Sequence, residues 1–184
     1  MEILKPRIRQ DFCDGAMEGE AAVSYSKTYG EVRAHYAEAD RTLPPETLMY
    51  RVTTFRGEDS PEALLWALTV LEPVLVAGEC NMTRGHFHQD RAEPEIYFGC
   101  GGTGLLLLMD QERKVWAEEV SQGSVHYIRG TWAHRLINTG DTPFKVGCCW
   151  KEKAGHDYAA IEEAPFPVRV YRRNGKLEFE SPQL

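Results

Sequence analysis

From residue 48 onward, the sequence is a series of short β-rich runs separated by turn residues at close intervals. Gly, Pro, Asn and Asp gather between the runs, as in the segment 139–143. Many short strands at such spacing are typical of an antiparallel sandwich or barrel. The sequence therefore predicts an all-β domain, with strands expected at residues 49–55, 96–98, 104–109, 115–120, 125–128, 135–138, 144–147, 168–171 and 177–179.

Three segments need a separate decision. The first half of residues 63–71 suits a helix and the second half suits a strand, and the β-rich surroundings favour a strand. Residues 31–39 are rich in Ala and in suitably placed charges, which predicts a short helix that ends before Pro44. Asn174-Gly175 lies between two alternating runs and predicts a hairpin near the C-terminus.

The length and composition favour one globular domain. The chain has 184 residues, of which 42% are hydrophobic, enough for a sizeable core. No apolar run approaches the roughly 20 residues needed to cross a bilayer, and residues 1–6 lack the apolar stretch of a signal peptide. We therefore expect a cytoplasmic protein with no membrane partner, a single domain over residues 1–184 and a barrel core at about residues 48–158.

Charge and cysteine content exclude other classes. The net charge is −7 and no cluster of Lys and Arg is visible, so a nucleic-acid partner is not expected. A small anionic ligand stays compatible with this charge, because a few local donors can hold it. The cysteines are odd in number, two of them are adjacent, and none forms a CxxC pair, which favours free thiols over disulfides or a zinc–cysteine site.

The histidine pattern points to a metal site. If residues 86–88 are a strand, His86 and His88 point to the same side while Phe87 packs behind them. Glu95 follows after a loop, and His134 opens a later strand-like run. Three imidazoles and a carboxylate leave open positions on Fe(II), Mn(II), Zn(II) or Ni(II). Taken alone, a His-x-His pair is more often coincidental.

Two longer motifs strengthen the metal interpretation. Gly85-His86-Phe87-His88, followed by Glu95 and Gly102, resembles the first motif of the cupin family. Gly123, followed by the segment 132–138 with its histidine and trailing asparagine, resembles the second motif. Arg129 stands where cupins usually have a turn proline that binds no metal. The spacing favours Glu95 as the ligand, so Glu93 is expected to be a solvated loop residue.

A narrower resemblance covers about residues 50–158. Segments 83–88, 90–93, 132–135 and 154–158 together are similar to the cupin-type, archaeal-style glucose-6-phosphate isomerases. That resemblance implies a cupin (double-stranded β-helix, or jelly-roll) barrel with a short N-terminal helical segment and extra terminal strands. It also implies interconversion of glucose 6-phosphate and fructose 6-phosphate by a homodimer with one divalent metal ion per subunit, Fe(II) being favoured.

The resemblance also assigns residues. The metal ligands would be His86, His88, Glu95 and His134, with Glu95 and His156 as catalytic residues. The substrate-binding positions would be Tyr50, Thr69, Thr83, Gly85, His156 and Tyr158. Neutral donors of this kind can hold a phosphate in an acidic protein. Without the resemblance, Tyr50 and Thr69 would be interpreted as ordinary strand residues, and Trp150 stands where the family has a tyrosine.

Several alternatives stay open at this level. Glu95 could remove the C2 proton to give a cis-enediol, or hydride could shift directly between C1 and C2. In both routes a Lewis acid would stabilise the developing negative charge, and His156 would assist opening of the sugar ring. Arg84 could add positive charge or point to solvent, and Asp157 could orient His156 or cap a turn. A metal-dependent cupin oxygenase and a non-catalytic sugar-phosphate sensor are the competing functions, and mannose 6-phosphate stays open as a further substrate.

Overall fold

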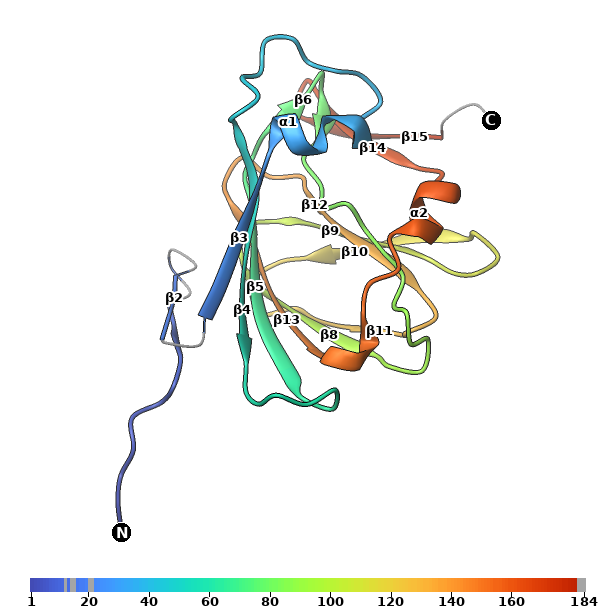
Figure 1. Cartoon of the computed structure of the whole chain (residues 1–184). Coiled ribbons are helices and arrows are strands. Elements are labelled where there is room, and N and C mark those ends of the chain that lie inside the picture. The colour runs from blue at the N-terminus through green and yellow to red at the C-terminus, as the bar shows by residue number, and fades with distance from the viewer. Residues whose placement is uncertain (12, 14–15, 20–21, 182–184) are drawn as a thin grey trace.

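The computed structural model describes residues 1–11, 13, 16–19 and 22–181 (Figure 1). Among these residues, most of the regular structure is β-strand, with two short α-helices and two short 3₁₀ helices (η1, η2). No described helix is long and apolar enough to cross a membrane. In chain order the elements are β1 (Arg9–Gln10), β2 (Met17–Glu18), β3 (Ala22–Thr28), α1 (Tyr29–Val32), η1 (Arg33–His35), β4 (Leu48–Arg56), β5 (Leu64–Leu71), β6 (Leu75–Val76), β7 (Glu79–Cys80), β8 (Glu95–Gly101), β9 (Gly104–Met109), β10 (Val115–Val120), β11 (Val125–Ile128), β12 (Ala133–Asn138), β13 (Phe144–Lys151), η2 (Glu152–Ala154), α2 (Ala159–Glu163), β14 (Arg169–Arg173) and β15 (Lys176–Glu180).

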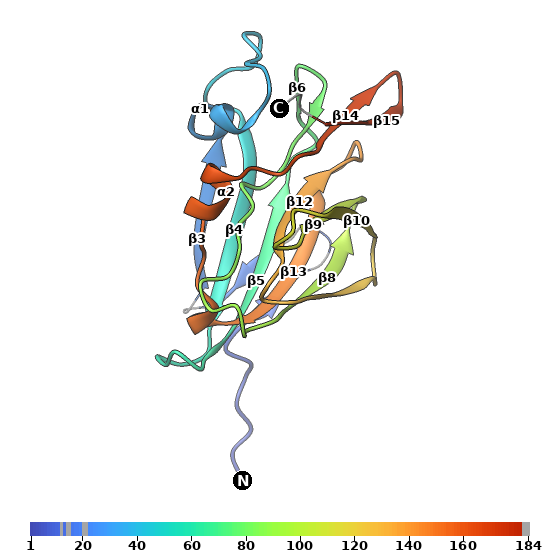
Figure 2. The same cartoon turned by 90° about the vertical axis from the view of Figure 1, so that its right-hand side faces the viewer.

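Two sheets form the walls of a barrel. The larger has six strands in the order β11-β8-β13-β5-β4-β3, and the smaller has three in the order β10-β9-β12. Their strands pair antiparallel, and strands distant in sequence lie side by side, as β13 does between β5 and β8. In Figure 1 the smaller sheet lies opposite β4 and β5, and Figure 2 shows strands β3, β4, β5, β13 and β8 of the larger sheet side by side. The predicted all-β cupin barrel is confirmed.

The core fills the space between these sheets. All six residues of β9 and all six of β12 are buried, which agrees with the near-continuous apolar sequence of β9. Opposite them, Met49 of β4, Leu71 of β5 and Phe144 of β13 are fully inaccessible. The interior between β9 and β12 on one side and β4, β5 and β13 on the other is therefore densely packed.

Most strand predictions agree with the structure. β9, β10 and β11 have the predicted bounds, and residues 64–71 form a strand rather than a helix. The predicted C-terminal hairpin is β14–β15, where Asn174 and Gly175 both have positive φ (52° and 73°). Positive φ at both central residues is the requirement of a type I′ turn, which explains the Asn-Gly pair.

The predicted helix at 31–39 is wrong in position and length. The helical segment begins at Tyr29, where the Glu31 carboxylate accepts a hydrogen bond from the Thr28 backbone N–H (2.8 Å). It ends at His35, because Tyr36 is extended and its hydroxyl donates to the buried Asn81 Oδ1 (2.9 Å). A tertiary contact therefore overrides the local helix preference of the residues that follow.

β3 and α2 were not predicted from the sequence. Residues 23–26 of β3 are all exposed, so this strand lacks the alternation of apolar and polar residues that marks a half-buried strand. The helix α2 is only five residues long, shorter than periodicity can detect. β3 contributes Tyr25 and Lys27 to a cavity inside the molecule, and α2 begins directly after Tyr158, which also lines that cavity.

Candidate active site

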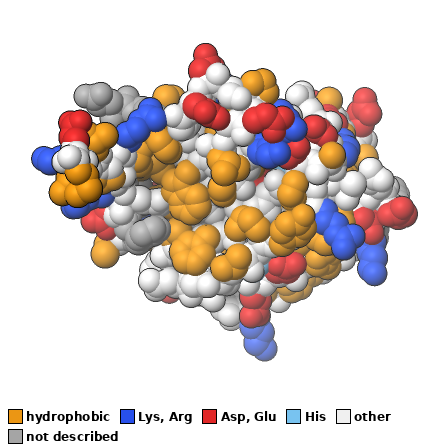
Figure 3. Space-filling view, turned by 90° about the horizontal axis from the view of Figure 1, so that it is seen from below, with side chains coloured by type: hydrophobic (Ala, Val, Ile, Leu, Met, Phe, Trp, Pro, Cys, Tyr) orange, Lys and Arg blue, Asp and Glu red, His pale blue; other side chains and the backbone are white. Residues whose placement is uncertain are grey.

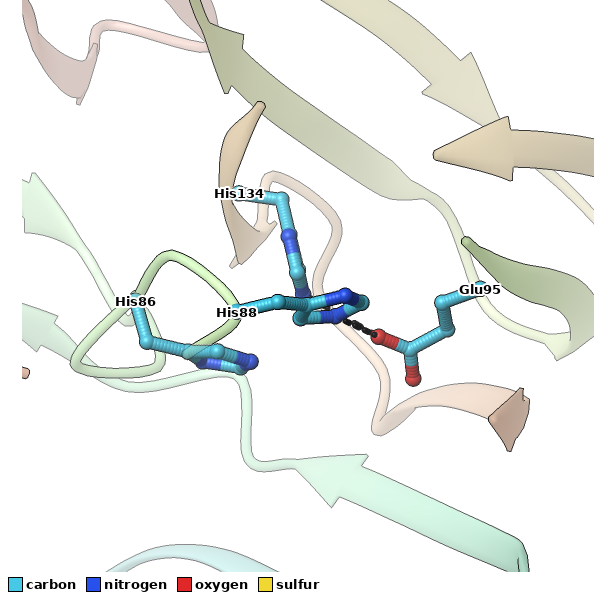
Figure 4. A group of neighbouring side chains, drawn as sticks. All are labelled: His86, His88, Glu95 and His134. Carbon is cyan, nitrogen blue, oxygen red and sulfur yellow. Dashed lines mark hydrogen bonds and ion pairs between the residues drawn. The ribbon is translucent and has the colours of Figure 1, made fainter. Parts of the chain in front are cut away.

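Three imidazoles and one carboxylate meet inside the barrel (Figure 4). His86 and His88 come from the segment between β7 and β8, Glu95 is the first residue of β8, and His134 is the second residue of β12. One ligand atom from each lies within 4.8 Å of all the others. His88, Glu95 and His134 are buried and His86 is partly buried. The four residues predicted from the sequence are thus brought together.

The segment 86–88 is not part of a regular strand, contrary to the sequence-based expectation. His86 instead forms a single antiparallel bridge with His134, with hydrogen bonds of 3.2 and 3.0 Å in the two directions, and Phe87 forms another with Asp157. Phe87 is buried beneath the Arg91 guanidinium, 4.3 Å from the ring centroid. The extended backbone still places the two histidines together and Phe87 behind them, as the strand hypothesis required.

Hydrogen bonds orient the His88 ring. Its Nδ1 lies 2.7 Å from the Glu93 backbone carbonyl, so Nδ1–H donates there and Nε2 faces Glu95. The Nε2 atoms of His88 and of His134 each lie 3.2 Å from the same oxygen, Glu95 Oε2. A carbonyl that fixes one ring nitrogen while the other faces a shared centre is the usual arrangement around a protein-bound metal.

The electrostatics of the cluster fit a cation. Burial lowers the pKa of His86 well below its usual range, so this imidazole is neutral and its Nε2, buried with no hydrogen-bond partner among the described residues, is free to coordinate. Burial alone would raise the pKa of Glu95, but His134 and His88 outweigh it and lower that pKa. Burial likewise opposes ionisation of His88, but the Glu95 carboxylate raises its pKa. This donor set suits a divalent transition metal.

Glu93 is not the solvated loop residue expected from the sequence. It is buried, and its carboxylate pairs with Lys153 (2.9 Å) and Lys151 (3.4 Å). Both lysines also reach Glu62, at 2.6 and 3.1 Å. Since the Glu93 carbonyl is the acceptor for His88 Nδ1, these ion pairs anchor the loop that orients a cluster histidine. Glu93 is a positioning residue.

Glu93→Gln is expected to weaken divalent-metal binding by roughly tenfold, the lower end of the range for groups that orient metal ligands. The substitution removes the ion pairs but keeps the side-chain size, so the loop loses its anchor. Metal affinity can be measured by competition with a chromogenic chelator. Glu62→Gln is the matched control, because it removes the exposed partner of the same lysines while Glu93 stays in place. Equal metal affinity in wild type and Glu93→Gln would contradict this role.

A cavity of about 470 Å³ adjoins the cluster. His86 and Glu95 line it, together with every position predicted to bind substrate: Tyr50, Thr69, Thr83, Gly85, His156 and Tyr158. These residues come from β4, β5 and two loops, and only the fold places them around one space. The predicted substrate-binding residues therefore share a cavity with two members of the cluster.

Individual cavity residues have defined positions. Thr83 Oγ1 accepts a hydrogen bond from the Leu136 backbone N–H (3.0 Å), which fixes the loop before Gly85. Gly85 has φ +76°, and a Cβ there would lie 3.0 Å from both Arg135 Nε and Phe166 Cε2, so the turn requires glycine. Gly85 itself lines the cavity.

His156 and Tyr158 form a ring pair at the cavity. Their rings are stacked with centroids 5.7 Å apart, and the His156 ring meets the His86 ring edge-on at 4.4 Å. Burial lowers the pKa of His156, which keeps its imidazole neutral near pH 7. Of the two roles considered for Asp157, the structure shows capping: Oδ1 accepts from the Ala160 N–H at the start of α2, and Oδ2 accepts from Arg91.

The two tryptophans separate. Trp132 packs edge-on against Trp116 at 4.8 Å and belongs to the barrel wall. Trp150 lines the cavity and lies edge-on to His156 at 6.3 Å. Its indole therefore takes part in shaping the site as well as the wall.

Sequence reasoning missed several cavity residues. Tyr97 lies two positions after Glu95 on β8, and the alternation of a strand would have placed it on the same side. Tyr25 and Lys27 lie on β3, the strand that was not predicted. Arg84 does not point wholly to solvent: it lines the cavity with its guanidinium 4.4 Å from the Tyr158 ring centroid.

Among solved structures, the oxalate decarboxylase of Bacillus subtilis is similar with a TM-score of 0.48 at 18% sequence identity. The match covers 59% of this chain and 26% of that chain. A structure of an oxalate oxidase gives a TM-score of 0.46 at 14% identity over 77% of this chain and 56% of that chain.

Sequence comparison is more specific. Residues 26–180 match the family model described as glucose-6-phosphate isomerase (GPI). The glucose-6-phosphate isomerase of Thermococcus litoralis is 38% identical over 132 residues, 72% of this chain and 70% of that protein. The protein of the same name from Pyrococcus horikoshii is 32% identical over 175 residues, 93% of this chain and 92% of that protein. The chain therefore belongs to the glucose-6-phosphate isomerase (GPI) family.

Proposed function

We propose that this protein is a metal-dependent aldose–ketose isomerase that interconverts glucose 6-phosphate and fructose 6-phosphate. The observation that carries the proposal is one shared cavity, in which the His/Glu cluster adjoins a group of hydroxyl, imidazole and backbone donors. One end suits the carbonyl and hydroxyl oxygens of a sugar, and the rest suits its phosphate. The family match supports this choice of substrate.

The four-residue cluster is proposed to hold one divalent metal ion per subunit through His86, His88, Glu95 and His134. Fe(II) is the favoured ion, and Mn(II), Zn(II) and Ni(II) accept the same nitrogen and oxygen donors. When bound, such an ion acts as a Lewis acid that polarises a sugar carbonyl. The protein contributes fixed ring orientations and a partly buried environment that strengthens the electrostatic interaction.

The cavity residues are proposed to bind and orient the sugar phosphate. Tyr50, Thr69, Thr83 and Tyr158 offer hydroxyls, and the Gly85 backbone is open to close approach. His156 is proposed as the group that assists ring opening, because a neutral imidazole can accept a proton from a sugar hydroxyl. Its ring lies next to His86 and therefore close to the cluster.

Two routes between C1 and C2 fit this site. Glu95 is ionised and lines the cavity, so its carboxylate can take the C2 proton, exchange it with solvent and protonate C1 of the cis-enediol. A carboxylate shared with a cation is a weak base, and a direct hydride shift between C1 and C2 needs no base at all. The two routes differ in whether solvent hydrogen enters the product at carbon.

The test is a direct measurement of the reaction by NMR. Metal-loaded protein is incubated with fructose 6-phosphate labelled with carbon-13 at C2, and we expect the label to appear at C2 of glucose 6-phosphate without oxygen consumption. In deuterated water, the hydride shift requires essentially no deuterium at carbon in the product, so substantial early deuterium would exclude it and favour proton transfer. Folded, metal-loaded protein that leaves fructose 6-phosphate unchanged would contradict the proposal and favour the sensor; oxygen uptake would favour the oxygenase.

We further propose a homodimer of single-domain subunits acting in the cytoplasm, where phosphorylated sugars are found. β3 is an edge strand of the six-stranded sheet, and its Val23 and Tyr25 side chains are 71% and 50% exposed. An exposed edge strand offers unpaired backbone groups to a second copy. Figure 3 shows further hydrophobic side chains gathered on the lower face of the molecule, so exposed apolar surface is not confined to this edge.

A further inference from the structure

A second cavity, of about 400 Å³, is separate from the one that carries the proposed reaction. The two cavities share no lining residue. The second lies between α2 and the turn that joins β9 to β10, and Phe87 forms part of its wall. Its volume falls within the range of cavities that hold small molecules in proteins. A ligand here would therefore occupy a place of its own, away from the sugar phosphate.

Part of the wall of this second cavity is apolar. Phe87 lines it together with Met109, the last residue of β9, and Ala164, the residue after α2. The Arg91 guanidinium lies 4.3 Å from the Phe87 ring centroid, so a cation and an aromatic ring border the same space. Apolar wall of this kind favours a ligand that has an apolar part to bury.

Four charged side chains also line the second cavity, two of each sign: Arg91, Arg113, Asp110 and Glu163. Arg91 pairs with Asp157 (2.8 Å), which lies outside the lining of the cavity. Among the residues that the structure describes, the other three charged side chains have no ion-pair partner, and they do not pair with one another. Positive and negative groups therefore face one space without neutralising each other.

Both guanidinium groups retain donors. A guanidinium has five N–H groups. Arg91 Nη1 is buried and has no hydrogen-bond partner among the described residues. The Arg113 guanidinium donates through Nη2 to the Pro165 backbone carbonyl (2.8 Å), which holds the side chain against the end of α2. Two oriented guanidinium groups with unused N–H groups are suited to a carboxylate.

The balance of charges distinguishes between classes of ligand. The two arginines attract a simple anion, but the two carboxylates repel it, and a simple cation meets the reverse. A ligand that carries both charges is attracted by all four groups. We propose that the second cavity binds a free α-amino acid with an apolar side chain, with its carboxylate at the two arginines, its ammonium at the two acidic residues and its side chain against Phe87. This site goes beyond the proposed function and does not depend on it.

The test is calorimetry on the metal-loaded protein with L-leucine, L-methionine and L-phenylalanine. We expect at least one of them to bind with one molecule per subunit. That amino acid is then compared with two analogues of the same side chain, which for leucine are 4-methylpentanoate, without the ammonium, and 3-methylbutylamine, without the carboxylate. Each analogue should bind about tenfold more weakly or worse, the loss expected when a hydrogen bond to a charged group is removed.

Substitutions locate the site. Glu163→Gln and Arg113→Gln should each weaken binding of the amino acid by about tenfold, because each removes one of the four charges. Glu112→Gln and Lys114→Gln are the matched controls: both residues are exposed in the turn between β9 and β10, neither lines the cavity, and binding should stay as in wild type.

A repeat of the titration on chelated protein excludes the metal as the binding site, since an α-amino acid can itself chelate a divalent ion. The affinity should be the same with and without metal. Three results would overturn the proposal: none of the three amino acids binds, binding disappears with the metal, or Glu163→Gln and Arg113→Gln both bind as wild type does. None of these results bears on whether the protein isomerises sugar phosphates.

Discussion

Replacing His88 by alanine is expected to lower divalent-metal affinity by more than about 100-fold and to reduce isomerase activity in parallel. Removing a metal ligand lowers metal affinity more than removing a group that only orients a ligand, and the latter change typically lowers affinity by about 10- to 100-fold. His88 is one of four donors within 4.8 Å, and its ring is already fixed by the Glu93 carbonyl. Removing it leaves three donors, so the ion is held more weakly.

The fold should survive this substitution, because the barrel wall at β8 and β12 is held by ladder hydrogen bonds and by the apolar core rather than by His88. Circular dichroism and metal content after gel filtration are the measurements. His35→Ala is the control, since His35 is a histidine outside the cluster. A His88→Ala protein that retains full metal content and full activity would show that the cluster is not the metal site.

Phe144→Ala is expected to destabilise the protein by about 3–5 kcal/mol, the usual cost of emptying a buried phenylalanine site. Phe144 opens β13, is completely inaccessible and pairs across the sheet with Leu71. Gly104 of β9 packs so closely that a Cβ there would lie 2.4 Å from the Phe144 ring, so the void cannot be filled by a side chain from that direction. The melting temperature should fall by about 6–20 °C for a chain of this size.

Phe179→Ala removes the same side chain from β15, where it is 57% exposed, and should change the melting temperature by no more than a few degrees. Thermal unfolding followed by circular dichroism compares the two. Equal shifts in the two variants would mean that the space between the sheets is not the principal core. Since metal binding also stabilises the folded state, both variants are compared without added metal.

The barrel was predictable because its strands are half-buried or fully buried. β9 is a continuous apolar run with a turn at each end, and its bounds follow from the sequence. β3 lacks that signal because its side chains are exposed, and the segment 31–39 shows a helix preference that the buried contact between Tyr36 and Asn81 overrides. Local sequence thus predicts the strands whose side chains show a clear pattern of burial. It does not predict secondary structure that depends on one contact with a residue distant in the sequence.

The metal cluster and the substrate positions were predictable for a different reason. Their spacing forms motifs, and the motifs resemble a family. Glu93 was misjudged because its partners, Lys151 at the end of β13 and Lys153 in η2, lie far along the chain and meet it only in the folded barrel. Lys27 was missed because it lies on β3, whose position beside β4 no local pattern indicates.

The central claim is that an ion held by His86, His88, Glu95 and His134 makes this protein an isomerase of sugar phosphates. The most direct measurement is conversion of fructose 6-phosphate to glucose 6-phosphate in a coupled assay, before chelation, after chelation and after each divalent metal is restored. We expect activity to disappear with the chelator and to return with one or two metals, Fe(II) foremost. Full activity in the chelated, metal-free protein, or none with any metal in folded protein, would contradict the account.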